Sequence, residues 1–291
     1  MIILGFADYH DQALALAHEL GVDYLEVALH RFPDGESLVR LPLPLPDHVI
    51  LCRSLDHPND KLIEIIQTAK TAREHGCSRV TLVAPYLCYM RQDIENQPGE
   101  AVSQQIVGQM LADYFDDVIT VDPHLHRIDR LEQAIPLKNS IALMATPVIT
   151  AFLRQQDHHA MLFGPDGESE QWVSQLAGEL GFDWAVATKV RHGDTKINIT
   201  LPEKNFAGKD IYMLDDMIST GHTVAQATQL LFAQQARSVN VIVTHALFNQ
   251  QAERLLGEAG VSHIWSTDSV SHPSNRIALA PLLAQAIRQL K

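Results

Sequence analysis

The sequence predicts an α/β protein with two doubly wound domains, each built on a parallel sheet. Short apolar strands alternate with helical patterns along nearly the whole chain, which is typical of parallel βα units. The same rhythm runs through both halves of a chain of 291 residues, a length that suits two domains. We therefore place the domains at 1–144 and 145–276, related by an apparent duplication. The sequence leaves open whether a C-terminal helix, 277–291, packs back on the first domain.

Apolar runs and helical periodicity define the elements in order along the chain. In the first half they predict strands over 2–6, 24–29, 37–41, 48–52, 79–84, 118–121 and 135–143, and helices over 12–20, 60–75 and 101–115. In the second half they predict strands over 161–163, 184–189, 211–214, 239–244 and 263–266, and helices over 147–156, 171–180, 224–232, 251–259 and 277–290. Alternating prolines at 42, 44 and 46 exclude a helix there and form a stiff connector.

The composition argues against several classes of protein. A net charge of −13, from 35 acidic and 22 basic residues, argues against a general binder of nucleic acid or of membrane surfaces. It leaves room for a small anionic ligand, since one local basic pocket is enough. No apolar run reaches membrane-spanning length, and the first residues lack the pattern of a secretion signal. Three cysteines without a paired metal spacing predict no disulfide framework, so we expect a reducing, cytoplasmic location.

The stretch IYMLDDMISTGHT, from 211 to 223, has the pattern of a phosphate-binding loop. An apolar run reads as a buried strand, two carboxylates stand at its expected end, and a small polar loop leads into a helix. Backbone N–H groups of such a loop can hold an anion, whereas carboxylates suit sugar hydroxyls or a metal. The alternative is an ordinary strand–turn–helix whose polar residues are caps. The residues concerned are Asp215, Asp216, Ser219, Thr220, Gly221, His222 and Thr223.

A second polar stretch, RFPDGES over 31–37, lies between two expected strands. Asp34-Gly35 is a strong hairpin signal, so a plain turn explains the segment by itself. In the alternative, Phe32 stacks on a base while Asp34 and Glu36 accept hydrogen bonds from an exocyclic amine. The local pattern alone favours the turn.

Two further strand ends carry polar side chains. The loop PYLCYMRQD contains Arg91, which can clamp phosphate, and Gln92, which can read a base or phosphate edge; an ordinary exposed loop is the alternative. His124 and His126 have the spacing that places both imidazoles on one face of a strand, as in metal-dependent amidohydrolases. A barrel of that class needs eight βα units in one domain, and the second half of the chain supplies a phosphate loop instead.

The segment ATKVRHGDTK, from 187 to 196, reads as a strand that runs into a basic hairpin. Lys189 and Arg191 are separated by one residue, so they fall on one face of that strand. A solvated basic turn explains them equally well.

Taken together, these segments resemble a known family. LDDMISTGHT is similar to the ribose-5-phosphate loop of type I phosphoribosyltransferases and of ribose-phosphate pyrophosphokinases, which implies domains of the phosphoribosyltransferase type. In that family the acidic pair, here Asp215 and Asp216, meets the ribose hydroxyls, and the following loop wraps the 5-phosphate. Ser219 departs from the acidic residue that is usual at its place, and His222 departs from a glycine.

The resemblance to the pyrophosphokinases covers nearly the whole chain, with five motifs in the family's order. The family's loop that is similar to 31–37 binds the adenine of ATP, partly across a subunit boundary. This implies that Phe32, Asp34 and Glu36 bind ATP.

Three more segments gain a role from the resemblance. PYLCYMRQD and the following PGEAVS are similar to segments of archaeal-type members and imply that Arg91 and Gln92 bind ATP. The segment DPH is similar to the family's DLH and implies that His124 contributes to the Mg–ATP site. His126 stands where the family often has another residue, so we expect a structural role.

The segment GPDGES, from 164 to 169, resembles the family's PD-x-G loop. The resemblance implies that Asp166 holds a magnesium ion. Glu168 and Ser169 depart from the expected pair of small residues, and the Glu168 carboxylate adds a negative charge where pyrophosphate should lie. Lys189 and Arg191 match the cations on the family's catalytic loop, which meet the transferring diphosphoryl group.

The resemblance therefore implies a ribose-phosphate diphosphokinase. Such an enzyme transfers the diphosphoryl group of Mg–ATP to the 1-hydroxyl of ribose 5-phosphate, giving PRPP and AMP, with Mg²⁺ and without a covalent enzyme intermediate. The family also assembles as dimers, often joined into hexamers, so a homo-oligomer is expected. Two other hypotheses stay open. One is a catalytically weakened homologue that regulates a partner, suggested by Glu168, Ser219 and His222, and the other is a phosphoribosyltransferase.

Overall fold

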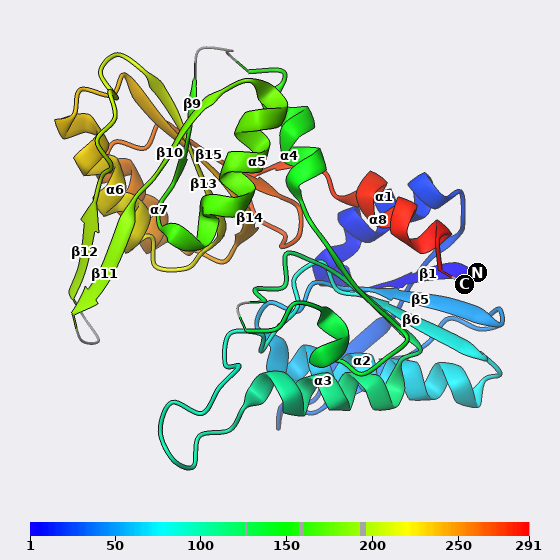
Figure 1. Ribbon diagram of the computed structural model, residues 1–291. Coiled ribbons are helices and arrows are strands. Elements are labelled where there is room, and N and C mark those ends of the chain that lie inside the picture. The colour runs from blue at the N-terminus through cyan, green and yellow to red at the C-terminus, as the bar shows by residue number, and fades with distance from the viewer. Residues whose placement is uncertain (126, 157–159, 193–195, 291) are drawn as a thin grey trace. The chain divides into compact units, whose positions relative to one another are not determined.

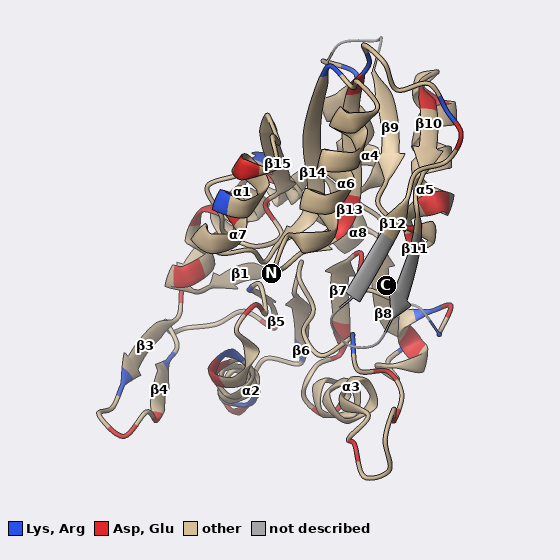
Figure 2. Cartoon of the chain, turned by 90° about the vertical axis from the view of Figure 1, so that its left-hand side faces the viewer, with Lys and Arg blue, Asp and Glu red and all other residues tan. Residues whose placement is uncertain are grey.

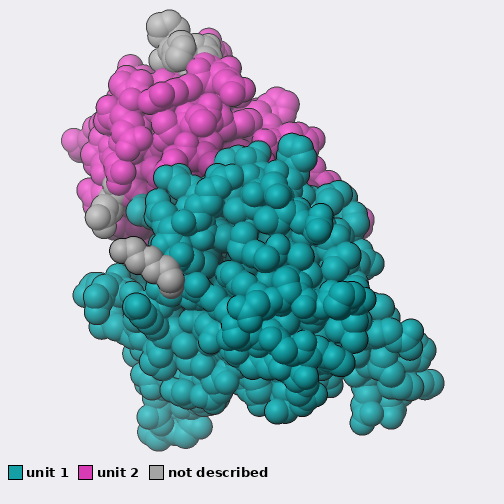
Figure 3. Space-filling view, turned by 90° about the vertical axis from the view of Figure 1, so that its right-hand side faces the viewer, with its two compact units in different colours: residues 1–144, 269–271, 279–291 teal, residues 145–268, 272–278 magenta. Residues whose placement is uncertain are grey.

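The computed structural model describes residues 1–125, 127–156, 160–192 and 196–290, and at positions 171, 189–192 and 196–198 it describes the backbone alone. The chain divides into two compact units (Figure 3). Unit 1 comprises residues 1–144, 269–271 and 279–291, and unit 2 comprises residues 145–268 and 272–278. Each unit is built on a six-stranded sheet with helices on both faces (Figure 1).

The sheet of unit 1 is wholly parallel and has the order β2-β1-β5-β6-β7-β8. Its strands are β1 (Ile2–Gly5), β2 (Tyr24–Glu26), β5 (His48–Cys52), β6 (Arg79–Val83), β7 (Asp117–Val121) and β8 (Asn139–Leu143). The central strands are nearly continuous apolar runs because both of their faces are buried. Helix α1 (His10–Leu20) packs against α8 (Ala280–Arg288) on one face, and α2 (Pro58–Glu74) packs against α3 (Ser103–Tyr114) on the other (Figure 1).

The sheet of unit 2 is also parallel and has the order β10-β9-β13-β14-β15-β16. Its strands are β9 (Met161–Gly164), β10 (Asp183–Val186), β13 (Asp210–Ile218), β14 (Ser238–Ala246), β15 (His263–Thr267) and β16 (Asn275–Ile277). Helix α4 (Thr146–Leu153) packs against α5 (Glu170–Leu180), and α6 (His222–Ala233) packs against α7 (Gln250–Glu258). Apolar residues of the sheet and of α6 and α7 form one core cluster, which includes Met213, Val241, Val224, Leu231 and Leu256.

The two sheets share one topology. In each, the first strand in the chain lies between the second and the third, and the later strands follow in sequence. Each unit also inserts an antiparallel hairpin between its second and third sheet strands: β3 (Ala28–Arg31) with β4 (Ser37–Arg40), and β11 (Thr188–His192) with β12 (Lys196–Thr200). The predicted fold class, two parallel-sheet α/β domains of similar plan, is therefore confirmed.

Several expected strands have different limits in the structure, and the strand expected over 24–29 is divided between β2 of the main sheet and β3 of the hairpin. The strand expected over 211–214 continues to Ile218, because its pairing with β14 extends to the last residues of both strands. The strand expected over 184–189 is divided, since β10 joins the main sheet whereas β11 pairs with β12. The strand expected from residue 135 begins at Asn139, because Ile135 completes a turn by donating its N–H to the carbonyl of Leu131 at 2.8 Å.

The helices begin one to three residues away from their expected positions. Helix α6 begins at His222 rather than at 224, and α8 begins at Ala280 because residues 275–277 form β16. Among the helices that the structure describes, none is both long and apolar enough to cross a membrane.

Candidate functional site

The predicted site residues of unit 2 lie near the carboxyl ends of three neighbouring strands. β9 leads into the loop that carries Asp166, and β10 leads into the segment that carries Lys189 and Arg191. β13 carries Asp215 and Asp216 near its end. After β9 the chain forms β10 on one side of that strand and later forms β13 on its other side. The boundary between β9 and β13 is therefore a topological switch point, where the strand order reverses. Open α/β sheets bind ligands outside the carboxyl ends of their strands at such a point.

The loop between β13 and α6 has the elements of an anion site. Asp215 and Asp216 are half-buried, and the N–H of Asp216 donates to the Asp215 carboxylate at 3.0 Å. Ser219 and Thr220 are exposed in the turn that follows. The first backbone N–H groups of α6 have no partner within the helix, so together with the turn they can hold an anion.

Gly221 lets this loop approach helix α7 closely. Its φ of 76° is in the left-handed region, and a Cβ added there would lie 3.3 Å from side-chain atoms of Leu256. A residue with a side chain would therefore strain the backbone and press on α7. The next two residues, His222 and Thr223, begin the helix with an exposed imidazole and a half-buried hydroxyl.

A cavity of about 480 Å³ opens beside this loop. Ser219, Thr220 and His222 line one side of it, and Asn249 and Arg254 of the α7 region line another. Asn249 caps α7, since its side-chain oxygen accepts from the N–H of Ala252 at 3.1 Å. The loop thus faces a space of the size of a small ligand, lined by hydroxyl, amide, imidazole and guanidinium groups together with the Glu258 carboxylate and apolar side chains such as Leu255.

In the loop after β9, the structure explains why Ser169 departs from the small residue that the family has at this position. Ser169 is buried, and its hydroxyl donates to the carbonyl of Asp166 at 2.7 Å. A Cβ on Gly164 would lie 2.1 Å from the Ser169 hydroxyl, so the glycine makes room for this serine. The Asp166 carboxylate accepts from the N–H of Glu168 at 3.2 Å, and Glu168 itself is exposed. Ser169 is therefore part of the internal structure of the loop.

The β11–β12 hairpin carries Lys189 and Arg191. Its register pairs Lys189 with Ile199 and Arg191 with Ile197. The side chains of the two cations, and the turn over 193–195, lie outside the part of the chain that the structure describes.

In unit 1, the stretch 31–37 forms the hairpin turn that its sequence indicates. The N–H of Phe32 donates to the carbonyl of Glu36 at 2.8 Å, and the N–H of Glu36 donates to the Asp34 carboxylate at 3.2 Å. Gly35 adopts the positive φ of 95° that such a turn needs. Phe32, Asp34 and Glu36 are all exposed, and Figure 2 shows the acidic tip of the hairpin projecting from the unit.

The loop after β6 places Arg91 in solvent and Gln92 partly inside the loop. Among the described residues no carboxylate pairs with Arg91, so its guanidinium is available for an anion. The Gln92 amide donates to the carbonyl of Ile94 at 2.9 Å, which ties the loop to itself. Burial raises the pKa of the neighbouring Cys88 thiol to about 12, so this cysteine cannot act as a thiolate nucleophile at neutral pH.

The chain turns sharply after β7, the strand next to β6. Asp122 and His124 have φ values of 40° and 53°, and the N–H of His124 donates to the carbonyl of Asp122 at 2.9 Å. Residues other than glycine adopt such angles at a cost of roughly 1–3 kcal/mol, and they concentrate at functional sites. His124 thus lies, like Arg91, on a loop at the carboxyl edge of the unit 1 sheet. His126 lies outside the described residues.

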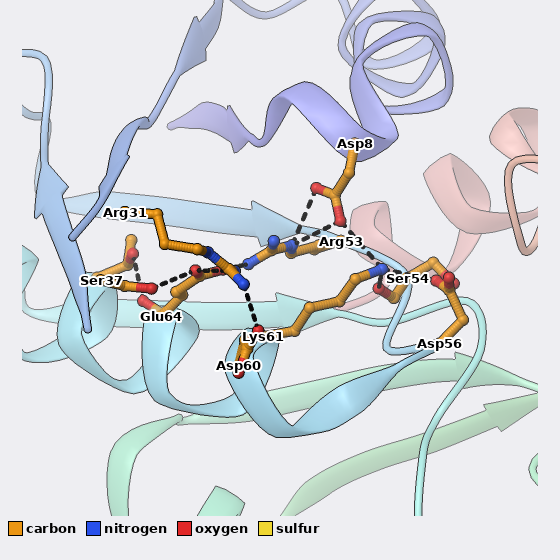
Figure 4. A network of polar contacts seen from close by, with 10 residues as sticks. Asp8, Arg31, Ser37, Arg53, Ser54, Asp56, Asp60, Lys61 and Glu64 are labelled. Atoms are coloured by element: carbon orange, nitrogen blue, oxygen red, sulfur yellow. Dashed lines mark hydrogen bonds and ion pairs between the residues drawn. The ribbon is translucent and has the colours of Figure 1, made fainter. Parts of the chain in front are cut away.

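The switch point of unit 1, between β1 and β5, is filled by the unit's own charges (Figure 4). Arg53, which follows β5, donates to Asp8 at 3.0 Å and to Glu64 of α2 at 2.7 Å, and its guanidinium lies 4.2 Å from the centroid of the Phe6 ring. Lys61 pairs with Asp8 at 3.0 Å. This network was not predicted from the sequence, although an arginine directly after the apolar strand 48–52 is a signal that indicates a buried charge there.

The donor set of unit 2 suits a magnesium ion that arrives with a phosphate ligand. Within the described residues, no group of three or more His, Cys, Asp or Glu side chains could hold a metal by itself. Mg²⁺ is commonly bound through one or two carboxylates together with substrate phosphates and water. Asp166, Asp215 and Asp216 provide such carboxylates at the ends of adjacent strands, whereas the imidazole of His124 is a less typical ligand for this ion.

Comparison with protein families gives matches over both halves of the chain. Residues 1–114 match the model of the N-terminal domain of ribose phosphate pyrophosphokinase. Residues 137–274 match the model of the phosphoribosyl transferase domain. The second match includes the 211–223 stretch and the loop after β9.

Individual relatives and a solved structure agree with these matches. The ribose-phosphate pyrophosphokinase of Methanopyrus kandleri is 32% identical over 294 residues, covering 100% of this chain and 99% of the relative. Ribose-phosphate pyrophosphokinase 2 of Archaeoglobus fulgidus is 31% identical, covering 94% of this chain and 96% of the relative. The crystal structure of phosphoribosylpyrophosphate synthetase from Mycobacterium smegmatis shares the fold, with a TM-score of 0.83, 24% identity and coverage of 99% and 97%. The chain therefore belongs to the ribose-phosphate pyrophosphokinase family of enzymes.

Proposed function

We propose that this protein is a ribose-phosphate diphosphokinase that makes PRPP and AMP from Mg–ATP and ribose 5-phosphate. The observation that carries the proposal is the anion loop Ser219–Thr223 directly after the carboxylates Asp215 and Asp216, at the switch point of unit 2. In the reaction, the 1-hydroxyl oxygen attacks the β-phosphorus of ATP and loses its proton. The bond between the β-phosphorus and the oxygen bridging to the α-phosphorus breaks, and AMP leaves with that oxygen.

The acceptor binds at unit 2 in this proposal. Backbone N–H groups of the loop and the hydroxyls of Thr220 and Thr223 hold the 5-phosphate, while Asp215 and Asp216 accept hydrogen bonds from the ribose hydroxyls. Ser219 contributes a further donor, and Gly221 keeps the loop close to α7. The exposed imidazole of His222 is positioned at the helix start, where a ring N–H can donate to the phosphate.

The donor binds through residues of unit 1. Phe32 stacks on the adenine, while Asp34 and Glu36 accept from its exocyclic amine. Arg91 binds the triphosphate, and Gln92 and His124 complete the nucleotide site. The exposure of the Phe32 ring and of the Arg91 guanidinium supports these roles, since both groups are accessible to a ligand.

Asp166, with His124 as a second candidate, would hold Mg²⁺ on the triphosphate. When bound, the ion neutralises phosphate charge and orients the transferring group. Lys189 and Arg191 stabilise the charge that develops on the β-phosphoryl oxygens in the transition state. Holding both substrates in line supplies the rest of the catalysis, so no covalent enzyme intermediate is needed.

The proposal extends to organisation and location. We assign the donor-binding part to a domain at 1–144, joined by the C-terminal helix, and the acceptor-binding part to a domain at 145–276. We further propose a homo-oligomer, a dimer or a hexamer assembled from dimers, because apolar side chains are exposed on the β3–β4 hairpin at Leu29, Phe32 and Leu38. The three cysteines are buried, and within the described residues they form no disulfide, which supports a reducing, cytoplasmic location.

Two other functions are separated from this one by a single assay. A phosphoribosyltransferase would have no use for the nucleotide-binding residues of unit 1. A regulatory homologue would bind ligands without turnover, as Glu168, Ser219 and His222 suggest. Purified protein with Mg²⁺, ATP, ribose 5-phosphate and inorganic phosphate should release AMP in a sugar-dependent manner. Absence of AMP above the background without sugar would reject the enzymatic proposal and favour the regulatory one.

A further inference from the structure

The β3–β4 hairpin, which carries the turn over 32–36, stands apart from the main sheet of unit 1. In the described part of the chain β3 pairs with β4 alone, and every residue of β3 is exposed. A two-stranded ribbon is at best marginally stable in water without further packing. Its orientation must therefore come from its contacts with α2, against which β4 packs.

Glu64 of α2 binds both ends of the turn. Arg31 and Ser37 are cross-strand partners and form the last pair before the turn. The Ser37 hydroxyl donates to Oε1 of Glu64 at 2.6 Å, and the Arg31 guanidinium donates to the same oxygen at 3.3 Å (Figure 4). Arg31 is also held by Asp60, one helical turn earlier on α2, at 2.5 Å. One carboxylate thus closes the base of the turn.

The other oxygen of Glu64 is anchored in the interior of unit 1. Oε2 accepts from Arg53 at 2.7 Å, and only 1% of Glu64 and 4% of Arg53 are exposed. Arg53 is held in turn by Asp8, in the short 3-10 helix that follows β1. Charges this deeply buried persist only when they are paired and hydrogen-bonded, so the position of the Glu64 carboxylate is closely determined. It connects the carboxyl edge of the sheet to the base of the hairpin.

We propose that Glu64 is a positioning residue for nucleotide binding: through Arg31 and Ser37 it sets the orientation of the turn that presents Phe32, Asp34 and Glu36. This inference rests on the proposed function for its catalytic consequence. A carboxylate that only stabilises the fold would affect both substrates alike. A positioning carboxylate weakens the ATP site selectively, because the ribose phosphate loop belongs to unit 2.

The test compares Glu64→Gln and Ser37→Ala with the wild-type chain. Glu64→Gln keeps the shape but removes the charge, and Ser37→Ala removes one tie while leaving the Glu64–Arg53 pair intact. We expect the Kd of Mg–ATP, measured by calorimetry, to rise roughly tenfold in Glu64→Gln, the size expected for one lost hydrogen bond to a charged group. The KM of ribose 5-phosphate should stay within roughly twofold of the wild-type value.

Asp117→Asn provides a matched control. Asp117 is as buried as Glu64, at 1% exposure, and it also pairs with an arginine, but it begins β7 at the amino edge of the same sheet. This variant should lower the melting temperature and leave the Kd of Mg–ATP unchanged. Amide hydrogen exchange gives a second measurement that needs no activity. Exchange of Phe32 and Gly35, whose N–H groups close the turn, should accelerate in the Glu64 and Ser37 variants and not in the control.

Each result decides one of the two proposals. If the wild-type chain neither binds ATP nor releases AMP, the proposed function fails, while the exchange rates still show whether Glu64 holds the turn. Unchanged exchange of the turn in folded variants, or equal weakening of both substrates, overturns the positioning role. If Glu64→Gln does not fold, Ser37→Ala alone decides the question.

Discussion

Arg79 and Asp117 form a bidentate ion pair across neighbouring strands, with N–O distances of 2.8 and 2.9 Å. Burial by itself would raise the pKa of Asp117, but hydrogen bonds from Arg79, Asn139 and Thr81 outweigh burial and lower this pKa. We expect Asp117→Asn to reduce the free energy of unfolding by about 1–3 kcal/mol at pH 7, as judged by denaturant titration. A carboxylate whose pKa is lowered in the folded state contributes its full stabilisation above its pKa in the unfolded chain, about 4. That stabilisation is lost as the pH falls through the pKa of the folded state. A stability difference that stays constant down to pH about 3 would contradict this assignment.

Two half-buried histidines should make the protein sensitive to mild acid. Burial lowers the pKa of His48, whose ring bonds Thr81 at 2.9 Å, and it lowers the pKa of His272 as well. The unfolded chain then takes up protons first as the pH falls below about 6.5, so the folded state loses stability from there downward. Unfolding measured between neutral and mildly acidic pH should show this loss. His48→Gln should flatten the dependence; an unchanged slope would exclude His48 as a cause.

Thr223→Val tests the phosphate loop. Loss of the hydroxyl should raise the KM of ribose 5-phosphate roughly tenfold and change the KM of ATP much less, because the donor binds at unit 1 in our proposal. Thr228→Val on the same helix is the control, since the Thr228 hydroxyl bonds the carbonyl of Val224 at 2.8 Å inside the core. Equal KM values for the sugar phosphate in Thr223→Val and wild type would remove this residue from the site.

Gly221→Ala tests the close approach of the loop to α7. The positive φ and the contact with Leu256 should together cost about 1–3 kcal/mol of stability and also raise the KM of ribose 5-phosphate. Gly181→Ala separates backbone strain from the contact with Leu256. Gly181 has a φ of 71° at the end of α5, and a Cβ there meets nothing within 4 Å. The control should lose stability through its backbone alone. If both variants keep the wild-type KM, the conformation of Gly221 has no role in binding.

Lys189→Ala tests the basic hairpin. A cation that acts in the transition state should lower kcat by a factor on the order of 10³ when removed, with little change in the Kd of ATP. Lys209→Ala, which removes a lysine paired with Asp183 at 2.7 Å, should leave kcat unchanged. If the variant showed only a weaker affinity for ATP and an unchanged kcat, Lys189 would bind ATP in the ground state and have no specific role in the transition state.

Local signals in the sequence were sufficient for most elements of the fold. Apolar runs and helical periodicity predicted the alternation of strands and helices, and Asp34-Gly35 predicted the hairpin turn that the structure has. The family motifs predicted membership in the ribose-phosphate pyrophosphokinases, which the comparisons confirm. These features succeed because they depend on residues close together in the chain, or on whole motifs. The assignments of individual site residues stay predictions.

Only the tertiary structure decided how distant segments combine. The strand expected to end at 214 reaches Ile218 because β14 continues to pair with it, a fact about a partner strand. Ser169, which departs from the small residue that the family has at its place, is buried against Gly164. The bonds of Glu64 to Arg31 and Arg53 join three separate segments of the chain. In the sequence, Glu64, Arg31 and Arg53 look like ordinary polar residues, because their partners lie in other segments of the chain. Their burial and pairing depend on the strand order and helix placement of the folded unit, because a charge can leave water only where the fold supplies a partner.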